Sequence, residues 1–142
     1  MSSFDPWRAR SAALFANEAF YQAFADRDYE GMSALWAHTL PILCLHPGWP
    51  VLVGREAVLD SWKRLLGGAA IGLEMSHPRI HFVGAVAFVS CSERVGRDWL
   101  AATNAFAQED GVWRMVFHQA GPAPPPPPEA EPDSGDPGSR PN

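Results

Sequence analysis

The sequence predicts an α+β domain in which N-terminal helices cover one face of an antiparallel sheet. In the first half of the chain, apolar residues recur at spacings of three and four, which is typical of amphipathic helices. In the second half, alternating apolar runs are separated by two-residue turns that contain glycine, which is typical of β-hairpins. Helices followed by a meander of strands indicate the α+β class.

Each predicted helix has residues that favour its start or its end. Asp5 can cap the first helix and Pro6 suits its first turn, while Asp28 can cap the second helix. Pro41 ends the second helical segment, and the pair Gly67-Gly68 stops the third. The predicted helices span residues 7–25, 29–37 and 55–66.

The predicted strands are separated by clear turn signals. The pairs Gly84-Ala85, Gly96-Arg97 and Asp110-Gly111 each predict a two-residue turn, and the last is the strongest hairpin signal of the chain. Pro78 predicts a kink or bulge within its strand, because proline cannot donate to a sheet. The predicted strands span residues 42–46, 51–53, 73–83, 86–95, 98–109 and 112–120.

Two-residue turns also predict which strand residues face each other. Counting outwards from the turns gives one apolar face, which we expect under the helices: Ile80, Phe82, Ala87, Val89, Cys91, Ala102, Asn104, Phe106, Met115, Phe117 and Gln119. The opposite face would carry His118, among other polar residues, and a slip of one residue would invert a strand. Asn104 and Gln119 are polar on the apolar face, so either neighbours satisfy them or they point into a wet cavity.

Composition excludes several classes of function. The net charge is −5, of which four acidic residues and one arginine after residue 121 carry −3, leaving −2 for the body. A near-neutral body argues against binding to nucleic acid or to a membrane surface. We see no signal peptide and no apolar run of membrane-spanning length, so we expect a cytoplasmic protein with Cys44 and Cys91 reduced.

The C-terminal segment differs from the rest of the chain. Prolines alternate there with acidic and small residues, and residues 124–128 are all proline. Such a segment cannot bury apolar surface, so we predict a folded domain over residues 1–121 and a disordered tail over residues 122–142.

The stretch from Leu43 to Trp62 contains the chemically most interesting residues. Strand alternation places Cys44 and His46 on one face, and His46 can act as a general base near neutral pH. The alternative is that His46 only lines a cavity or bonds to the turn that follows it. Cys44 could be a nucleophile, but a plain core residue is the simpler interpretation. No further ligands stand at a suitable spacing for a metal, and we expect neither metal nor cofactor.

Several motifs together resemble the nuclear transport factor 2-like superfamily, and its SnoaL-like branch in particular. They cover residues 9–122, and their order and spacing carry the resemblance more than any single motif. They are Phe20-Tyr21-x-x-Phe24, Asp28-Tyr29-x-x-Met32, Trp36, Cys44-x-His46-Pro47-Gly48-Trp49, Gly54-Arg55-Glu56-Ala57-Val58, Ser61-Trp62, Thr103-Asn104-x-Phe106, Asp110-Gly111-x-Trp113 and Phe117-His118-Gln119-Ala120-Gly121-Pro122.

The resemblance implies a cone-shaped fold, in which a curved sheet wraps round the long helix and encloses a ligand pocket. Members of the superfamily usually form homodimers through the sheet. They include a steroid isomerase, cyclases, dehydratases, an epoxide hydrolase and the association domain of the calmodulin-dependent kinase. The pocket residues implied here are Trp36, Cys44, Trp49, Trp62, Cys91, Phe106, Phe117 and Gln119.

The chain departs from these relatives at the positions that carry their chemistry. The isomerase base, a carboxylate before a proline, matches His46, and its protonated acid matches Asn104. Its tyrosine donor matches Tyr21. The pocket arginines of the kinase association domain match Asn104 and Gln119, which are both neutral.

Three functions follow as hypotheses. The first is a homodimeric domain that binds a small molecule of unknown identity. The second is an enzyme that transfers a proton on a small carbonyl compound, with His46 as base and Tyr21 and Asn104 as donors. The third is an assembly module that recruits partners through the sheet and the proline-rich tail.

Overall fold

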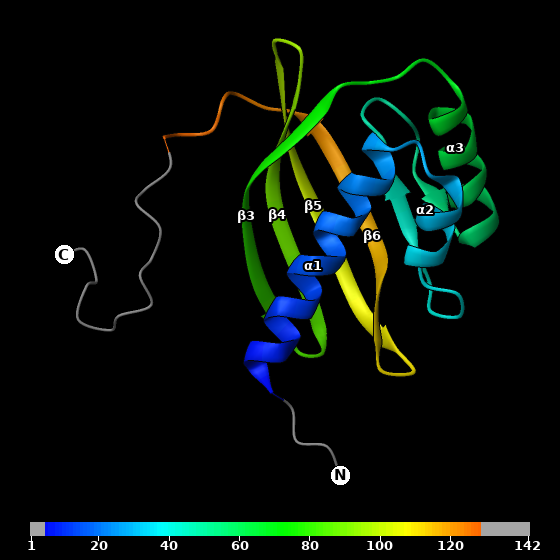
Figure 1. Cartoon of the computed structure of the whole chain (residues 1–142), viewed down its shortest axis with the longest axis vertical. Coiled ribbons are helices and arrows are strands. Elements are labelled where there is room, and N and C mark those ends of the chain that lie inside the picture. Colours follow the sequence, from blue (N-terminus) through cyan, green and yellow to red (C-terminus); the bar gives the residue numbers. More distant parts are fainter. Residues whose placement is uncertain (1–4, 129–142) are drawn as a thin grey trace.

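The computed structural model of the chain describes residues 5–128, and its elements follow the predicted order. The helices are α1 (Pro6–Ala25), α2 (Tyr29–Leu35) and α3 (Arg55–Gly67). The strands are β1 (Leu43–Leu45), β2 (Leu52–Val53), β3 (Leu73–Val83), β4 (Val86–Val95), β5 (Asp98–Glu109) and β6 (Val112–Pro122). Figure 1 shows α1 lying diagonally across the face of a curved sheet, with α2 and α3 grouped beside one edge. The predicted α+β class is confirmed.

All six strands form one open sheet in the order β2-β1-β6-β5-β4-β3. The strands β3 to β6 form the predicted antiparallel meander, whereas β1 lies parallel to β6. This parallel pairing places His46, just after β1, next to the C-terminal half of β6. Residues far apart in the sequence therefore meet at one end of the sheet.

The second helix is shorter than predicted, because β6 captures the backbone that would continue it. Trp36 bridges to Met115, and the backbone N–H of Ala37 donates to the Met115 carbonyl oxygen over 2.9 Å. Arg55 fixes the same corner by donating to the carbonyl oxygens of Ser33, Trp36 and Ala37. The start of α3 is thereby tied to the end of α2.

The hairpin register was predicted correctly next to all three turns and wrongly in the distant half of β6. Gln108 pairs with Trp113 and Phe106 pairs with Met115, as expected. A β-bulge between Ala105 and Phe106 then shifts the pairing by one residue, so that Asn104 faces His118. A bulge inserts one extra residue into a strand, so a register counted outwards from the turn is wrong beyond the bulge.

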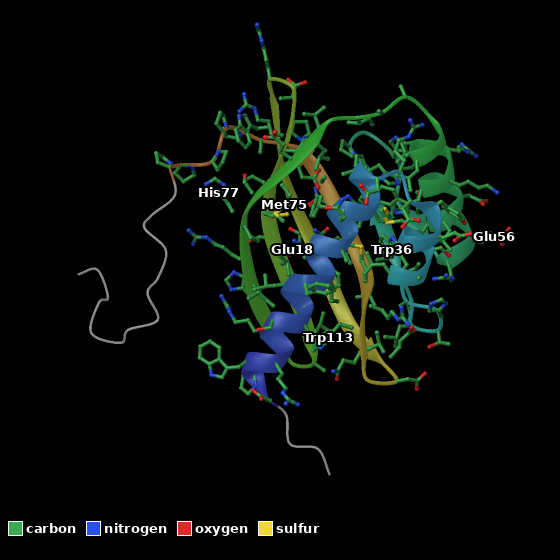
Figure 2. All side chains as sticks on the ribbon, in the orientation of Figure 1. Glu18, Trp36, Glu56, Met75, His77 and Trp113 are labelled. Carbon is green, nitrogen blue, oxygen red and sulfur yellow. The ribbon has the colours of Figure 1, made fainter. Side chains whose placement is uncertain are left out.

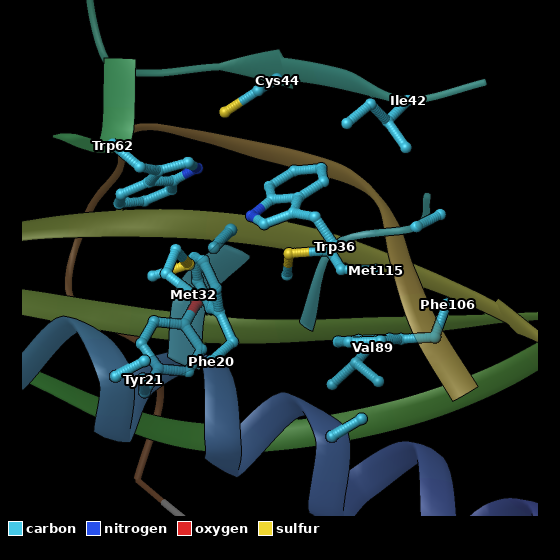
Figure 3. Packing of buried hydrophobic residues seen from close by; sticks show 14 of the residues in the cluster. Phe20, Tyr21, Met32, Trp36, Ile42, Cys44, Trp62, Val89, Phe106 and Met115 are labelled. Atoms are coloured by element: carbon cyan, nitrogen blue, oxygen red, sulfur yellow. The ribbon is translucent and has the colours of Figure 1, made fainter. Parts of the chain in front are cut away.

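The core lies between α1, α3 and the concave face of the sheet. Figure 3 shows Phe20 and Tyr21 on α1 pointing towards a cluster that contains Trp36 and Trp62. Phe20 contacts Trp62 edge to face, with ring centroids 5.3 Å apart. Figure 2 shows a surface position for comparison: Glu56 lies on the outer side of α3 and is exposed.

The C-terminal segment leaves the domain after β6. The backbone N–H of Ala123 still donates to the carbonyl oxygen of Trp99, and residues 123–128 have no regular secondary structure. The rest of the predicted disordered tail, from residue 129 on, lies outside the described residues. Within residues 5–128, no helix is long and apolar enough to cross a bilayer.

Candidate functional site

A cavity of about 230 Å³ opens where α1, α3 and the concave face of the sheet meet. Its walls are mainly apolar, and its polar side chains are Tyr21, His46, Glu93 and His118. The described residues that line it include no lysine and no arginine. The apolar and aromatic lining residues are Phe20, Phe24, Pro47, Trp49, Trp62, Leu65, Ile71, Leu73, Val95 and Leu100.

His46 is buried between two tryptophan rings, 4.9 Å from Trp49 and 4.7 Å from Trp62 by ring centroids. Its Nε2 atom lies 2.8 Å from the Ser61 hydroxyl. That hydroxyl donates its proton to the Val58 carbonyl oxygen over 2.6 Å, so it must accept from His46. The proton of His46 is therefore on Nε2, and Nδ1 carries a lone pair.

His118 faces the same cavity from β6, with its ring centroid 6.2 Å from that of His46. The Nδ1 atom lies 2.6 Å from Oδ1 of Asn104. Asn104 uses its amide nitrogen to donate to Asn17 over 2.8 Å, so its Oδ1 atom is the acceptor for His118. The proton of His118 is therefore on Nδ1, and Nε2 has no hydrogen-bond partner among the described residues.

Tyr21 and Glu93 form the other polar wall of the cavity. The Tyr21 hydroxyl donates to Oε2 of Glu93 over 2.6 Å, and it accepts from Nδ2 of Asn104 over 3.1 Å. Cys91 lies 3.1 Å from the same hydroxyl oxygen, to which its thiol can donate. One chain of hydrogen bonds thus runs from His118 through Asn104 and Tyr21 to Glu93.

Burial disfavours the charged form of each titratable group of this site. It lowers the pKa of His46 to about 4, and together with the nearby His46 it lowers that of His118 to about 3. Burial also raises the pKa of Glu93 and, with Glu93 beside it, that of Tyr21. At neutral pH both imidazoles are neutral, and their bare nitrogens can accept a proton or a hydrogen bond.

Cys44 lies beside His46, with 3.6 Å between its Sγ atom and Nε2. Burial raises the pKa of this thiol to about 12, so the reactive thiolate is scarce at neutral pH. The part of the chain that the structure describes contains no group of three His, Cys, Asp or Glu residues that could hold a metal ion. Cys44 is fully buried and packs against His46.

The structure brings together some of the residues predicted for the site. Tyr21, His46, Trp49 and Trp62 line the cavity. Five others are buried nearby without lining it: Trp36, Cys44, Cys91, Asn104 and Phe106. Asn104 acts behind the wall, where it holds Tyr21 and His118 in place.

Phe117 and Gln119 were assigned to the wrong face of the sheet. Beyond the bulge they pair with Ala105 and Thr103, which point away from the helices. His118 takes the inward position and is only 3% exposed. On the inner face, His118 therefore stands where the uninterrupted register predicted Phe117, and Ala120 stands where it predicted Gln119.

Sequence reasoning missed His118 and Glu93. Glu93 follows the period of two that places Val89 and Cys91 on the inner face, and this alternation alone could have identified it. His118 could be found only by placing the bulge, for which the sequence holds no glycine or proline signal.

Comparisons with known proteins agree with this architecture. Residues 14–124 match the family model of the SnoaL-like domain. A curated relative, the F-box protein SKIP8 of Arabidopsis thaliana, is 23% identical over 112 residues, which cover 77% of this chain and 48% of that protein. The chain therefore spans about half the length of this relative.

Solved structures with the same fold include several of the nuclear transport factor 2-like family. A candidate dehydratase of this family from Streptomyces avermitilis is 28% identical with a TM-score of 0.75, over 84% of this chain and 99% of that chain. A candidate calcium/calmodulin-dependent kinase type II association domain from Thiobacillus denitrificans is 30% identical with a TM-score of 0.69. The match covers 77% of this chain and 93% of that chain. This chain belongs to the SnoaL-like domain family of the nuclear transport factor 2-like superfamily.

Proposed function

We propose that this domain binds a small, largely apolar molecule in the cavity between α1, α3 and the sheet. The observation that carries the proposal is a cavity of about 230 Å³ whose aromatic walls surround a few oriented polar groups. Sites for drug-sized ligands measure about 300–1,000 Å³, so we expect a smaller ligand with one or two rings.

A cavity-filling variant tests this proposal. Val95 lines the cavity at the end of β4, whereas Val83 stands exposed at the end of β3. We expect Val95→Trp to abolish binding of small aromatic probes such as isopropylbenzene, and Val83→Trp to bind them like the wild type. Equal binding by all three proteins in calorimetric titrations would place the ligand elsewhere and contradict the proposal.

A second candidate function is proton transfer on a bound molecule, and the two neutral imidazoles favour it. The bare Nδ1 of His46 or Nε2 of His118 could take a proton, since a neutral imidazole is a general base. The similarity to a candidate dehydratase supports testing this. Deuterium uptake from D₂O into a weak carbon acid such as 2-indanone, followed by NMR, should require His46 or His118. Uptake that persists in the double variant His46→Gln/His118→Gln would exclude it.

We also infer a homodimer formed through the outer face of the sheet. The corrected register supports it, because Phe117 joins Phe88 and Ala105 in one row across three strands on that face. Phe88 and Phe117 are partly exposed, as expected for apolar residues that a second copy covers. Location in the cytoplasm and the division into a domain and a tail stay predictions.

A further inference from the structure

The polar atoms that face the cavity have one chemical property in common. Tyr21 spends its only proton on Glu93, and Asn104 spends its amide protons on Asn17 and Tyr21. The two groups that could have donated to a ligand therefore donate to the protein itself. This removes the donors that a carbonyl oxygen or an oxyanion needs.

Apart from the indole N–H groups of Trp49 and Trp62, the polar groups left over in the lining are acceptors. His118 offers the lone pair of Nε2, because its proton on Nδ1 is held by Asn104. His46 offers the lone pair of Nδ1. Among the described residues, the Cys44 sulfur at 4.0 Å is the only possible hydrogen-bond partner of this nitrogen. The second carboxyl oxygen of Glu93 accepts no hydrogen bond from the described part of the chain.

The charges of the lining residues also favour a ligand that donates hydrogen bonds. Glu93 is the only acidic residue of the lining, and no basic residue of the lining opposes it. The faces and edges of Phe20, Phe24 and Trp62 stand around the same space, and aromatic faces attract cations. A carboxyl group and aromatic rings without a protein cation are complementary to an organic ammonium group.

We propose that the cavity selects a small organic amine, which donates hydrogen bonds to Glu93 and to the bare imidazole nitrogens. This inference rests on the proposed ligand-binding function and adds the chemical class of the ligand. A carbonyl compound or a carboxylate would meet only acceptors at Glu93 and at the two bare imidazole nitrogens.

A series of molecules with nearly the same shape tests the class of ligand. Isopropylbenzene, acetophenone, 1-phenylethanol and 1-phenylethylamine differ only in their polar group, and benzoate adds an anion of similar size. We expect the amine to bind at least about tenfold more tightly than acetophenone in calorimetric titrations, because hydrogen bonds to a charged group are the stronger kind. We expect no binding of benzoate.

The variant Glu93→Gln sharpens the test, because its amide oxygen can still accept from Tyr21 while its amide nitrogen turns a donor towards the cavity. We expect the preference to reverse, with the amine losing about tenfold or more and acetophenone gaining. Glu56→Gln, on the exposed side of α3, is the matched control and should keep the wild-type ranking.

Each outcome decides between the two proposals. If acetophenone or benzoate binds the wild type as tightly as the amine, the inference about the ligand class is wrong, while the binding function stands. If no member of the series binds, including isopropylbenzene, the binding function itself is wrong. The wild-type ranking decides even if Glu93→Gln does not fold.

Discussion

The Nδ1 atom of His118 lies 2.6 Å from Oδ1 of Asn104, and this contact exists because a β-bulge turns His118 inwards. The bulge shifts β6 by one residue against β5, so that His118 and Ala120 take the inward positions expected for Phe117 and Gln119. One local irregularity of the sheet thus determines which groups reach the cavity.

Asn104→Leu should destabilise the protein. Asn104 is fully buried and is bonded to Asn17, Tyr21 and His118, so its loss leaves buried polar groups unpaired. Each orphaned group costs about 1–3 kcal/mol. We expect the thermal midpoint to fall by at least about 5 °C. Thr103→Val, the next residue on the outer face, should change little, and a rise of the midpoint for Asn104→Leu would show that the amide is not structural.

The strand elements could be predicted almost completely, because their glycine turns and alternating residues are local signals. Strands β3, β4 and β5 have the predicted bounds. The inner and outer faces of the distant half of β6 could not be predicted, since a register counted from the turn is wrong beyond the bulge between Ala105 and Phe106. His46, Tyr21 and Trp62 were found from motif and period. His118 was missed because its orientation is set by tertiary structure.

His118→Gln should reduce the loss of stability that mild acid causes. The pKa of His118 is lowered to about 3 in the folded protein, against 6.5 for an ordinary histidine. Between pH 3 and pH 6.5 the unfolded chain binds more protons at this histidine than the folded protein does. The titration of His118 therefore leaves the free energy of unfolding unchanged above pH 6.5 and lowers it as the pH falls below that value. Glutamine can still donate to Asn104 but does not titrate. We expect the drop in unfolding free energy between pH 7 and pH 5 to shrink by about 2 kcal/mol.

Urea denaturation at both pH values measures this difference. His81→Gln, at an exposed position of β3, is the control and should follow the wild type. If His118→Gln loses as much unfolding free energy between pH 7 and pH 5 as the wild type, then His118 is charged in the folded protein.

Glu109→Gln should loosen the loop between α2 and β1. The Glu109 carboxylate accepts from the backbone N–H groups of His38, Thr39 and Leu40, and from the Thr39 hydroxyl. The His38 bond contributes most to lowering its pKa to about 2. A carboxyl with a lowered pKa stabilises the fold above its ordinary value of 4.5, and this effect is lost as the pH falls towards 2.

We therefore expect Glu109→Gln to lower the thermal midpoint at pH 7 and to approach the wild type near pH 2. Glu56→Gln should match the wild type at both values. A gap between Glu109→Gln and the wild type that does not narrow in acid would contradict the role of the carboxylate charge.

Phe117→Lys should separate the inferred homodimer into monomers. Phe117 lies on the outer face of β6, so a lysine there would place a charge at the centre of the expected interface without touching the cavity. Light scattering coupled to gel filtration should give twice the chain mass for the wild type and the single mass for the variant. A monomeric wild type would contradict the dimer.

The positions of the two imidazole protons test the account most directly. Long-range ¹H–¹⁵N NMR spectra of the ¹⁵N-labelled protein distinguish a protonated ring nitrogen from a bare one. We expect His46 to carry its proton on Nε2 and His118 on Nδ1, with both rings neutral at pH 6. A proton on Nε2 of His118 would reverse the chain of hydrogen bonds, give the cavity a donor, and contradict its selection of an amine.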